Sequence, residues 1–268
     1  MLGIKKLEHK IDSILKILSY KRVPGFDREN FNLHDYVSAI LRASILHQKA
    51  FGDKRFKNMG QDVVVTATGP SFQYYKPIAG AFHIGVNTAF RNPNIEYKAL
   101  FCQDPRCFGT EKISEDFIRY HNDKCEKYIG NSCAYSVNEN LEKYCVCNYM
   151  SENKFNYFIV IAPLPDFCCV IFSAFSYALW THPRRIFLVG ADCTLGHAAI
   201  TNNQIHENCA HLVKPWKDMA EFVKSYYEDI EIISVNPVGL KGLFKDVYTR
   251  EFLADHPDID RHSVEILD

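Results

Sequence analysis

The sequence predicts an α/β fold: a mainly parallel sheet, Rossmann-like in outline, with helices on both faces and further helices at the N-terminus. Short runs rich in Val, Ile and Phe recur along the chain, and segments with apolar residues at helical spacing lie between them. The predicted strands are residues 62–67, 81–86, 97–101, 157–162, 185–190 and 230–235. The predicted helices between them are residues 114–120, 171–180 and 216–227. Strands that alternate with helices favour a parallel sheet that is covered on both faces.

The first part of the chain has a different pattern. Leu7, Ile11 and Leu18 fall on one face of a predicted helix, and a second helix is expected over residues 35–50, after the break at Val23-Pro24-Gly25. The first helix either packs on its own domain or pairs with a second copy, which would make a homo-oligomer. The expected organisation is an N-terminal helical segment, a Rossmann-like domain and a C-terminal tail. These parts are residues 1–58, 59–247 and 248–268.

Composition narrows the class of protein. The 268 residues are 47% hydrophobic and 24% charged, which is typical of a globular chain. The net charge of -1 provides no basic field for nucleic acid, so nucleic acid is not an expected partner. The 10 cysteines lack the paired spacing of a zinc site, so we expect reduced thiols, a cytoplasmic protein and no metal.

One segment resembles a membrane span. Residues 158–180 carry only Asp166 as a charge, but Pro163 and Pro165 interrupt the apolar run. A buried strand, a turn and a buried helix are the preferred interpretation. Peripheral association with the inner face of the membrane stays open as an alternative.

Polar residues follow the predicted strands directly. The loop Thr68-Gly69-Pro70-Ser71 follows the first strand and Asn87 follows the second, while Asp104 and Asp192 follow two later ones. Ligands of parallel sheets bind at the carboxyl ends of the strands, although turns are rich in such residues for structural reasons as well.

The loop over residues 68–71 is the first candidate site. Gly69 lacks a side chain, which lets backbone N–H groups approach an anion, and the Ser71 hydroxyl can donate to a phosphate. The loop lacks the Lys of the Walker motif and the three glycines of the dinucleotide fingerprint. The sequence therefore favours neither a standard P-loop kinase nor a standard NAD enzyme.

The order of these motifs resembles the bacterial sialyltransferases that use a CMP-activated sugar, and their motility-accessory and pterin-pyrophosphokinase-like relatives. The matching elements span roughly residues 60–245. They are Ala67-Thr68-Gly69-Pro70-Ser71, Gly85-Val86-Asn87, Asp104-Pro105, the run Ile186-Phe187-Leu188-Val189-Gly190-Ala191-Asp192, and His211 upstream of Pro237. The resemblance implies a glycosyltransferase of surface polysaccharide biosynthesis, with a nucleotide-activated sugar and a glycan acceptor as partners and no other cofactor.

The resemblance also implies roles for individual residues. His211 would be the general base that removes a proton from the acceptor hydroxyl, with His197 and His206 in reserve. The residues implied to bind the nucleotide or donor are Thr68, Gly69, Pro70, Ser71, Asn87, Asp104, Gly190, Asp192 and Thr194.

The chain departs from the family pattern at several positions. Thr68 and Asp104 stand where asparagines are expected, and Cys168 and Cys169 replace a Thr-Ser-Gly element before a helix. Two alternatives to the transferase therefore stay open. One is an ATP- and magnesium-dependent pyrophosphokinase-like enzyme with Asp104 and Asp192 near the cation. The other is a non-catalytic nucleotide-binding partner protein.

Overall fold

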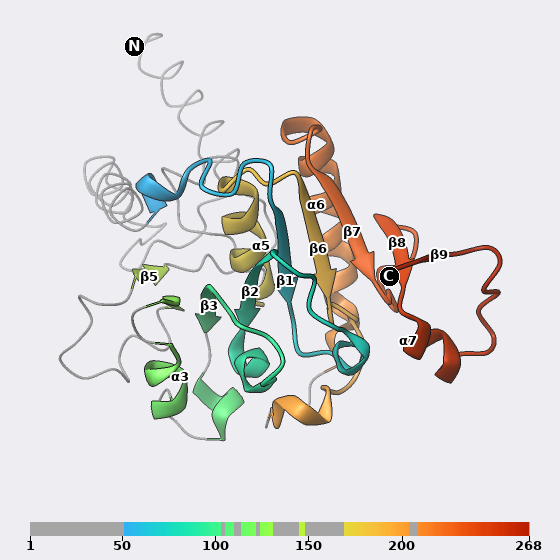
Figure 1. Ribbon diagram of the computed structural model, residues 1–268, viewed down its shortest axis with the longest axis horizontal. Coiled ribbons are helices and arrows are strands. Elements are labelled where there is room, and N and C mark those ends of the chain that lie inside the picture. Colours follow the sequence, from blue (N-terminus) through green and yellow to red (C-terminus); the bar gives the residue numbers. More distant parts are fainter. Residues whose placement is uncertain are drawn as a thin grey trace, which may run out of the picture.

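The computed structural model describes residues 51–102, 105–109, 114–121, 124–130, 145–147, 169–203 and 208–267. These residues form an α/β domain around a 9-stranded sheet (Figure 1). The predicted helices in residues 1–50, the predicted strand over residues 157–162, and Asp104, Cys168 and His206 lie outside the described residues.

Every described strand pairing is parallel, as the alternation of strands and helices predicts. The strand order is β5-β4-β3-β2-β1-β6-β7-β8-β9. The strands are β1 (Asp62–Thr66), β2 (Phe82–Val86), β3 (Ala99–Cys102), β4 (Glu126–Gly130), β5 (Cys145–Cys147), β6 (Arg185–Val189), β7 (Glu231–Val235), β8 (Lys245–Tyr248) and β9 (Glu265–Ile266). The helices are α3 (Glu115–Arg119), α5 (Ile171–Trp180), α6 (Val213–Tyr226) and α7 (Arg250–Asp255).

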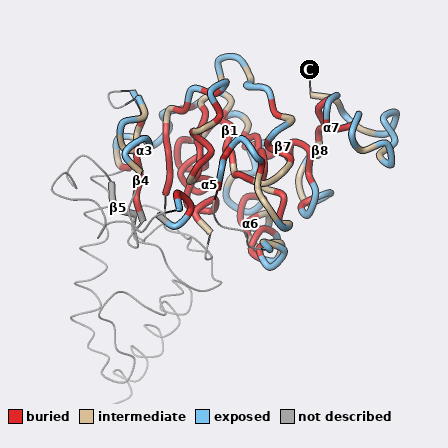
Figure 2. The backbone as a smooth tube through the Cα atoms, turned by 90° about the horizontal axis from the view of Figure 1, so that it is seen from below, coloured by how far each residue is buried: buried red, intermediate tan, exposed pale blue. Residues whose placement is uncertain are grey.

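The central strands are apolar on both faces because the sheet is covered on both sides. Val63 and Val65 of β1 belong to the core cluster under α5 and α6, whereas Val64 points into the opposite cluster. Helix α5 is buried along its whole length, packs against β1, β2 and β3, and contacts α6 through Phe172 and Trp216, whose ring centroids lie 4.6 Å apart. Figure 2 shows the resulting buried centre.

In the part of the chain that the structure describes, short elements cover the opposite face. They are α3 and the 3-10 helices η2 (Pro70–Tyr74), η3 (Asn87–Arg91), η4 (Pro105–Phe108) and η6 (Ala199–Thr201). Phe72 of η2 and Phe90 of η3 supply much of the apolar contact there. Two of these elements, η2 and η3, begin within a few residues of a strand end, which keeps the loops of that edge short and close to the sheet.

The segment that the sequence predicts as a tail after residue 247 is instead part of the domain. Thr249 caps α7 by accepting a hydrogen bond from the N–H of Phe252 at 3.3 Å, and β9 adds a parallel strand to β8. Tyr248, Phe252 and Leu253 bury one another, which explains why the segment folds back. Residues 239–243, between β7 and β8, form turns.

At the other end of the described chain, residues 51–58 pack against the end of α5. Trp180 donates its indole N–H to the carbonyl of Phe51 at 2.7 Å, and the side-chain amide of Asn58 donates to Thr181 Oγ1 at 3.0 Å. The last residues of the predicted N-terminal segment thus contact the core of the sheet domain. Among the described residues, no helix combines the length and hydropathy that a bilayer span requires.

Candidate functional site

The topology of the sheet defines where the candidate site lies. Strands β1 to β5 run outward to one side of β1, and β6 to β9 continue from its other side. The order in which strands are added to the sheet therefore reverses between β1 and β6, which are parallel, and the loops that follow these two strands leave the same carboxyl edge (Figure 1). Ligands of open parallel sheets bind in the crevice at such a switch point.

Two glycines allow the loops after β1 and β6 to touch. The N–H of Gly69 donates to the carbonyl of Gly190 at 2.9 Å, and a Cβ at Gly69 would stand only 2.5 Å from that oxygen. Gly190 adopts a φ of +66°, and a Cβ there would approach the carbonyl of Ala67 to 2.8 Å. Both glycines therefore permit contact between protein backbones. The sequence predicts instead that Gly69 opens the loop to an anion, but its N–H is already used within the protein.

Ser71 and Asp192 are brought together, as the sequence predicts, and they bind each other. Asp192 is 2% exposed and its Oδ2 accepts the backbone N–H of Ser71 at 2.7 Å, while its Oδ1 accepts the Ser71 hydroxyl. Burial raises the pKa of Asp192, and the two bonds from Ser71 partly offset that rise. In this structure the carboxylate joins the loops instead of facing a ligand.

The loop after β7 also contacts the loop after β6. The N–H of Gly239 donates to the carbonyl of Asp192 at 2.8 Å, and a Cβ at Gly239 would stand 2.6 Å from that oxygen. Gly239 therefore brings the β7 loop against the β6 loop, and Asp192 connects the loops that follow three strands.

Thr68 is the residue of the first loop whose side chain contacts the opposite segment of the site. Its Oγ1 lies 2.9 Å from Nδ1 of His197 and accepts a bond from the side-chain amide of Asn203 at 3.4 Å. The carbonyl of Thr68 accepts the N–H of Ala198 at 2.9 Å. Residues 197–203 therefore lie across the first loop. Sequence reasoning places His197 among the reserve candidates and misses Asn203, because nothing in residues 202–203 differs from an ordinary Asn-rich turn.

Asn87 lies beside Thr68 at this edge. Thr66 pairs with Gly85 in the parallel register of β1 and β2, so Thr68 and Asn87 each follow two residues beyond that pair. Asn87 has a φ of 49°, in the left-handed region that Asn tolerates better than most residues. Its Oδ1 is buried and accepts no hydrogen bond from a described residue, nor does the Thr88 hydroxyl find a partner among them. Buried polar atoms of this kind ordinarily bind water or a ligand.

His211 lies on a separate turn of the same edge. It belongs to η7 (Cys209–Leu212), directly before α6, and is exposed, with Nδ1 3.2 Å from the carbonyl of Asn208. Asn208 forms an isolated antiparallel β-bridge with Leu195, and the N–H of Cys209 donates to the carbonyl of Thr194 at 3.1 Å. The turn that carries His211 is therefore attached to the loop after β6 through the backbone of Thr194. The side chain of Thr194 is half-buried there.

The buried Cys193 at this edge is a poor nucleophile. Burial raises the pKa of the Cys193 thiol to about 12, and Cys169 is half-buried before α5. Within the described ranges, no three His, Cys, Asp or Glu side chains cluster as metal ligands would.

Comparisons with known proteins add two structural likenesses. No family model matches the chain, and no curated protein matches it in sequence. The chain is similar to the sialyltransferase CstII from Campylobacter jejuni in complex with cytidine-5'-monophosphate, with 15% identity and a TM-score of 0.37 over 65% of this chain and 79% of that chain. The complex of the same enzyme with CMP-3FNeuAc aligns with 13% identity and a TM-score of 0.34, again over 65% and 79%. Because both TM-scores lie below 0.5, we base the proposals below on the residues of this chain.

Proposed function

We propose that the protein is a glycosyltransferase that binds a nucleotide-activated sugar, with CMP as the first nucleotide to test, and transfers the sugar to a hydroxyl of a cell-surface glycan. The observation that carries the proposal is the pair of neutral side chains at the switch point, Thr68 and Asn87. A buried Asn87 Oδ1 that accepts no bond from a described residue suits a ligand hydroxyl. Ribose and sugar rings are rich in such donors.

In this proposal, nucleotide binding and proton transfer are carried out by two different segments of the chain. The switch point between β1 and β6 would hold the nucleotide, where ligands of parallel sheets bind. His211, exposed on the turn before α6, would remove the proton from the acceptor hydroxyl. The hydroxyl oxygen would then bond to the anomeric carbon of the sugar while the bond from that carbon to the phosphate breaks and the nucleotide leaves. An imidazole can accept a proton near neutral pH, so this step requires no metal hydroxide.

The geometry favours this proposal over the ATP- and magnesium-dependent alternative. That alternative assigns Asp192 to the cation, yet both of its carboxylate oxygens accept hydrogen bonds from Ser71. Burial also raises the pKa of this group, which makes the charged form that a cation needs less favourable.

Thermal-shift measurements with CMP, UDP, GDP and ATP, each with and without magnesium, test the ligand class. A ligand that binds only the folded protein raises its melting temperature. We expect stabilisation by CMP without magnesium. Stabilisation that requires both ATP and magnesium would contradict the proposal, and the absence of any nucleotide response would contradict both the transferase and the nucleotide-binding partner protein.

His211→Ala tests the chemical step. Loss of a general base costs about 10²–10⁴-fold in rate, so sugar transfer should fall by that factor while the affinity for CMP stays unchanged. His262→Ala is the matched control, since His262 is also exposed but lies in the segment after α7. Equal activity of the two variants would show that His211 is not the base.

A further inference from the structure

The first loop of the site, residues 68–71, has few hydrogen-bond donors that are available to a ligand. Gly69 donates its N–H to Gly190, Pro70 has none, and Ser71 uses both its N–H and its hydroxyl on Asp192. The hydroxyl of Thr68 is therefore the only side-chain donor of residues 68–71 that is not committed to Asp192. Thr68 is 5% exposed, so its proton has few directions in which to point.

The partners of Thr68 determine where that proton points. A hydroxyl has one proton and two acceptor lone pairs. The Asn203 amide nitrogen can only donate, so it occupies one lone pair of Thr68 Oγ1 across 3.4 Å. The bond between Thr68 Oγ1 and His197 Nδ1, at 2.9 Å, can run in either direction.

The two directions give the loop opposite properties. If Nδ1 of His197 carries no proton, Thr68 donates its own proton to the imidazole and has none to offer a ligand. If Nδ1 carries a proton, Thr68 accepts from both His197 and Asn203, and its hydroxyl proton is free to point into the site. A phosphate oxygen at the switch point must accept a hydrogen bond, and the Thr68 hydroxyl can donate one only in the second form.

We infer that His197 is a positioning residue: when its Nδ1 carries a proton, the Thr68 hydroxyl is directed toward the phosphate of the nucleotide donor. This inference rests on the function proposed above. His197 acts through Thr68 and takes no part in the chemical step. The pair would give the site a preference for nucleotides over nucleosides, since only the phosphate requires the donor.

Titration calorimetry with CMP and with cytidine, which lacks the phosphate, tests the inference. A hydrogen bond to a charged group contributes enough that His197→Ala should weaken CMP binding about 10-fold or more, with cytidine affinity changed less than about 2-fold. Thr68→Val should have the same selective effect, and the double variant should be no weaker than either single one, because both remove the same bond. His197→Asn, which can place an amide donor near the Nδ1 position, should restore most of the CMP affinity.

A spectroscopic measurement separates positioning from a merely structural role. The ¹⁵N shift of His197 Nδ1 reports whether that nitrogen carries a proton, and CMP but not cytidine should shift it toward the protonated value. If CMP binds and His197→Ala weakens CMP and cytidine equally, or the Nδ1 shift does not respond, the inference is overturned while the proposed function stands. If the wild-type protein binds neither CMP nor the other nucleotides, both fail.

Discussion

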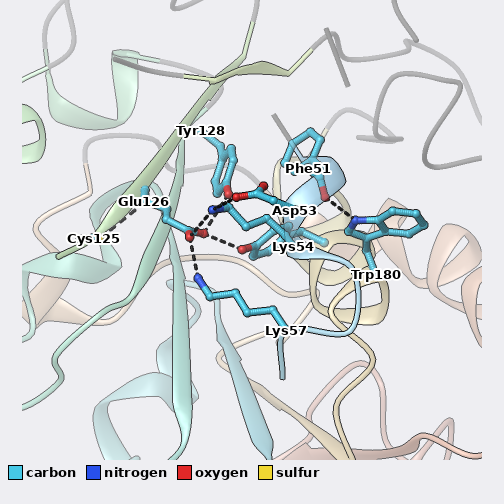
Figure 3. Close-up of polar contacts among 9 residues, drawn as sticks. Phe51, Asp53, Lys54, Lys57, Cys125, Glu126, Tyr128 and Trp180 are labelled. Carbon is cyan, nitrogen blue, oxygen red and sulfur yellow. Dashed lines mark hydrogen bonds and ion pairs between the residues drawn. The ribbon is translucent and has the colours of Figure 1, made fainter. Parts of the chain in front are cut away.

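The amino and carboxyl edges of the sheet differ in how their charged and polar side chains are bonded. At the amino edge the charged side chains are paired. Asp62 at the start of β1 accepts bonds from Arg184 and Arg185, with the shortest at 2.6 Å, and Glu126 at the start of β4 binds Lys57 Nζ at 2.6 Å. Figure 3 shows how Lys54, Lys57 and Tyr128 converge on Glu126.

At the carboxyl edge the side chains of the switch point are neutral or are held away from solvent. Thr68 and Asn87 carry no charge, and the carboxylate of Asp192 is buried between loops. The ion pairs of the amino edge stabilise the fold, whereas under the proposed function the carboxyl edge would bind the nucleotide, so variants at the two edges should change different measured quantities.

The largest expected effect is that of Gly69→Ala, which should damage both properties at once. The added Cβ would lie 2.5 Å from the Gly190 carbonyl and 2.7 Å from Asp192 Oδ2, forcing the β1 and β6 loops apart. Overpacking of this kind costs about 1–3 kcal/mol, and nucleotide binding should be lost with the switch point. Denaturant unfolding and calorimetry measure both effects.

Gly80→Ala is the matched control for that variant. Gly80 has a φ of +74°, but a Cβ added there would meet no atom within 4 Å, so the substitution adds only backbone strain. Nucleotide affinity should be unchanged. If Gly69→Ala binds nucleotide as Gly80→Ala does, the close contact of the two loops is not needed for the site.

The second prediction compares two asparagines that follow strands in the same left-handed conformation. Asn87 after β2 has a φ of 49° and Asn236 after β7 a φ of 52°. The side chain of Asn236 donates to Thr249 Oγ1 at 3.0 Å and accepts its N–H at 2.8 Å, which attaches β7 to the start of α7. Glycine tolerates the backbone at both positions.

Asn236→Gly should therefore lower the free energy of unfolding by about 2 kcal/mol and leave nucleotide affinity unchanged. Asn87→Gly should leave stability within about 0.5 kcal/mol and weaken nucleotide binding about 10-fold, because a ligand acceptor is removed. Unfolding curves measure the stability of both variants, and calorimetry measures their nucleotide affinity. Weaker nucleotide binding by Asn236→Gly together with unchanged binding by Asn87→Gly would place the ligand at the end of β7.

The third prediction concerns the amino edge alone. Burial by itself would raise the pKa of Glu126, but hydrogen bonds from Lys57 and Tyr177 outweigh it and leave the pKa below its ordinary value. Glu126→Gln removes the charge that these partners stabilise and should cost about 1–2 kcal/mol in unfolding free energy, without altering nucleotide affinity. Glu96→Gln, at an exposed pair with Lys98, is the control and should leave the melting temperature unchanged.

The smallest effect is a pH dependence of opposite sign at the two edges. Hydrogen bonds from Arg185 and then Arg184 outweigh burial and lower the pKa of Asp62 below its ordinary 3.8, so Asp62 stabilises the fold above that pH and loses the contribution as pH falls through its lowered pKa. Burial raises the pKa of Asp192 above 3.8, so its contribution is complete below that pH and declines as pH rises through the raised pKa.

Unfolding free energies of the wild type, Asp62→Asn and Asp192→Asn, measured from acid to neutral pH, check these signs. On acidification, the unfolding free energy of Asp62→Asn should approach that of the wild type. Over the same range, the unfolding free energy of the wild type should rise relative to that of Asp192→Asn. Slopes of the same sign in both comparisons would show that one of the two carboxylates has been assigned the wrong environment.

The sequence by itself determined the sheet and most of its elements. Runs such as Val63-Val64-Val65 read as strands buried on both faces, and α5 has the predicted bounds, because apolar periodicity is a local property. It also identified the strand ends Thr68, Asn87 and Asp192, since parallel strands bring their carboxyl ends to one edge. Four strands were missed. They are β5, β8 and β9, which are short, and β4, which begins with the charged residues Glu126 and Lys127.

Only the tertiary structure decided what those polar residues do. Ser71 and Asp192 are separated by 121 positions, and Thr68 and His197 by 129, so no local pattern reveals that each pair is bonded. The same holds for Gly69, whose missing side chain accommodates the backbone of Gly190. Hydrogen bonding is satisfied pairwise in space, so the sequence could place donors and acceptors at the switch point but not say which of them are left for a ligand.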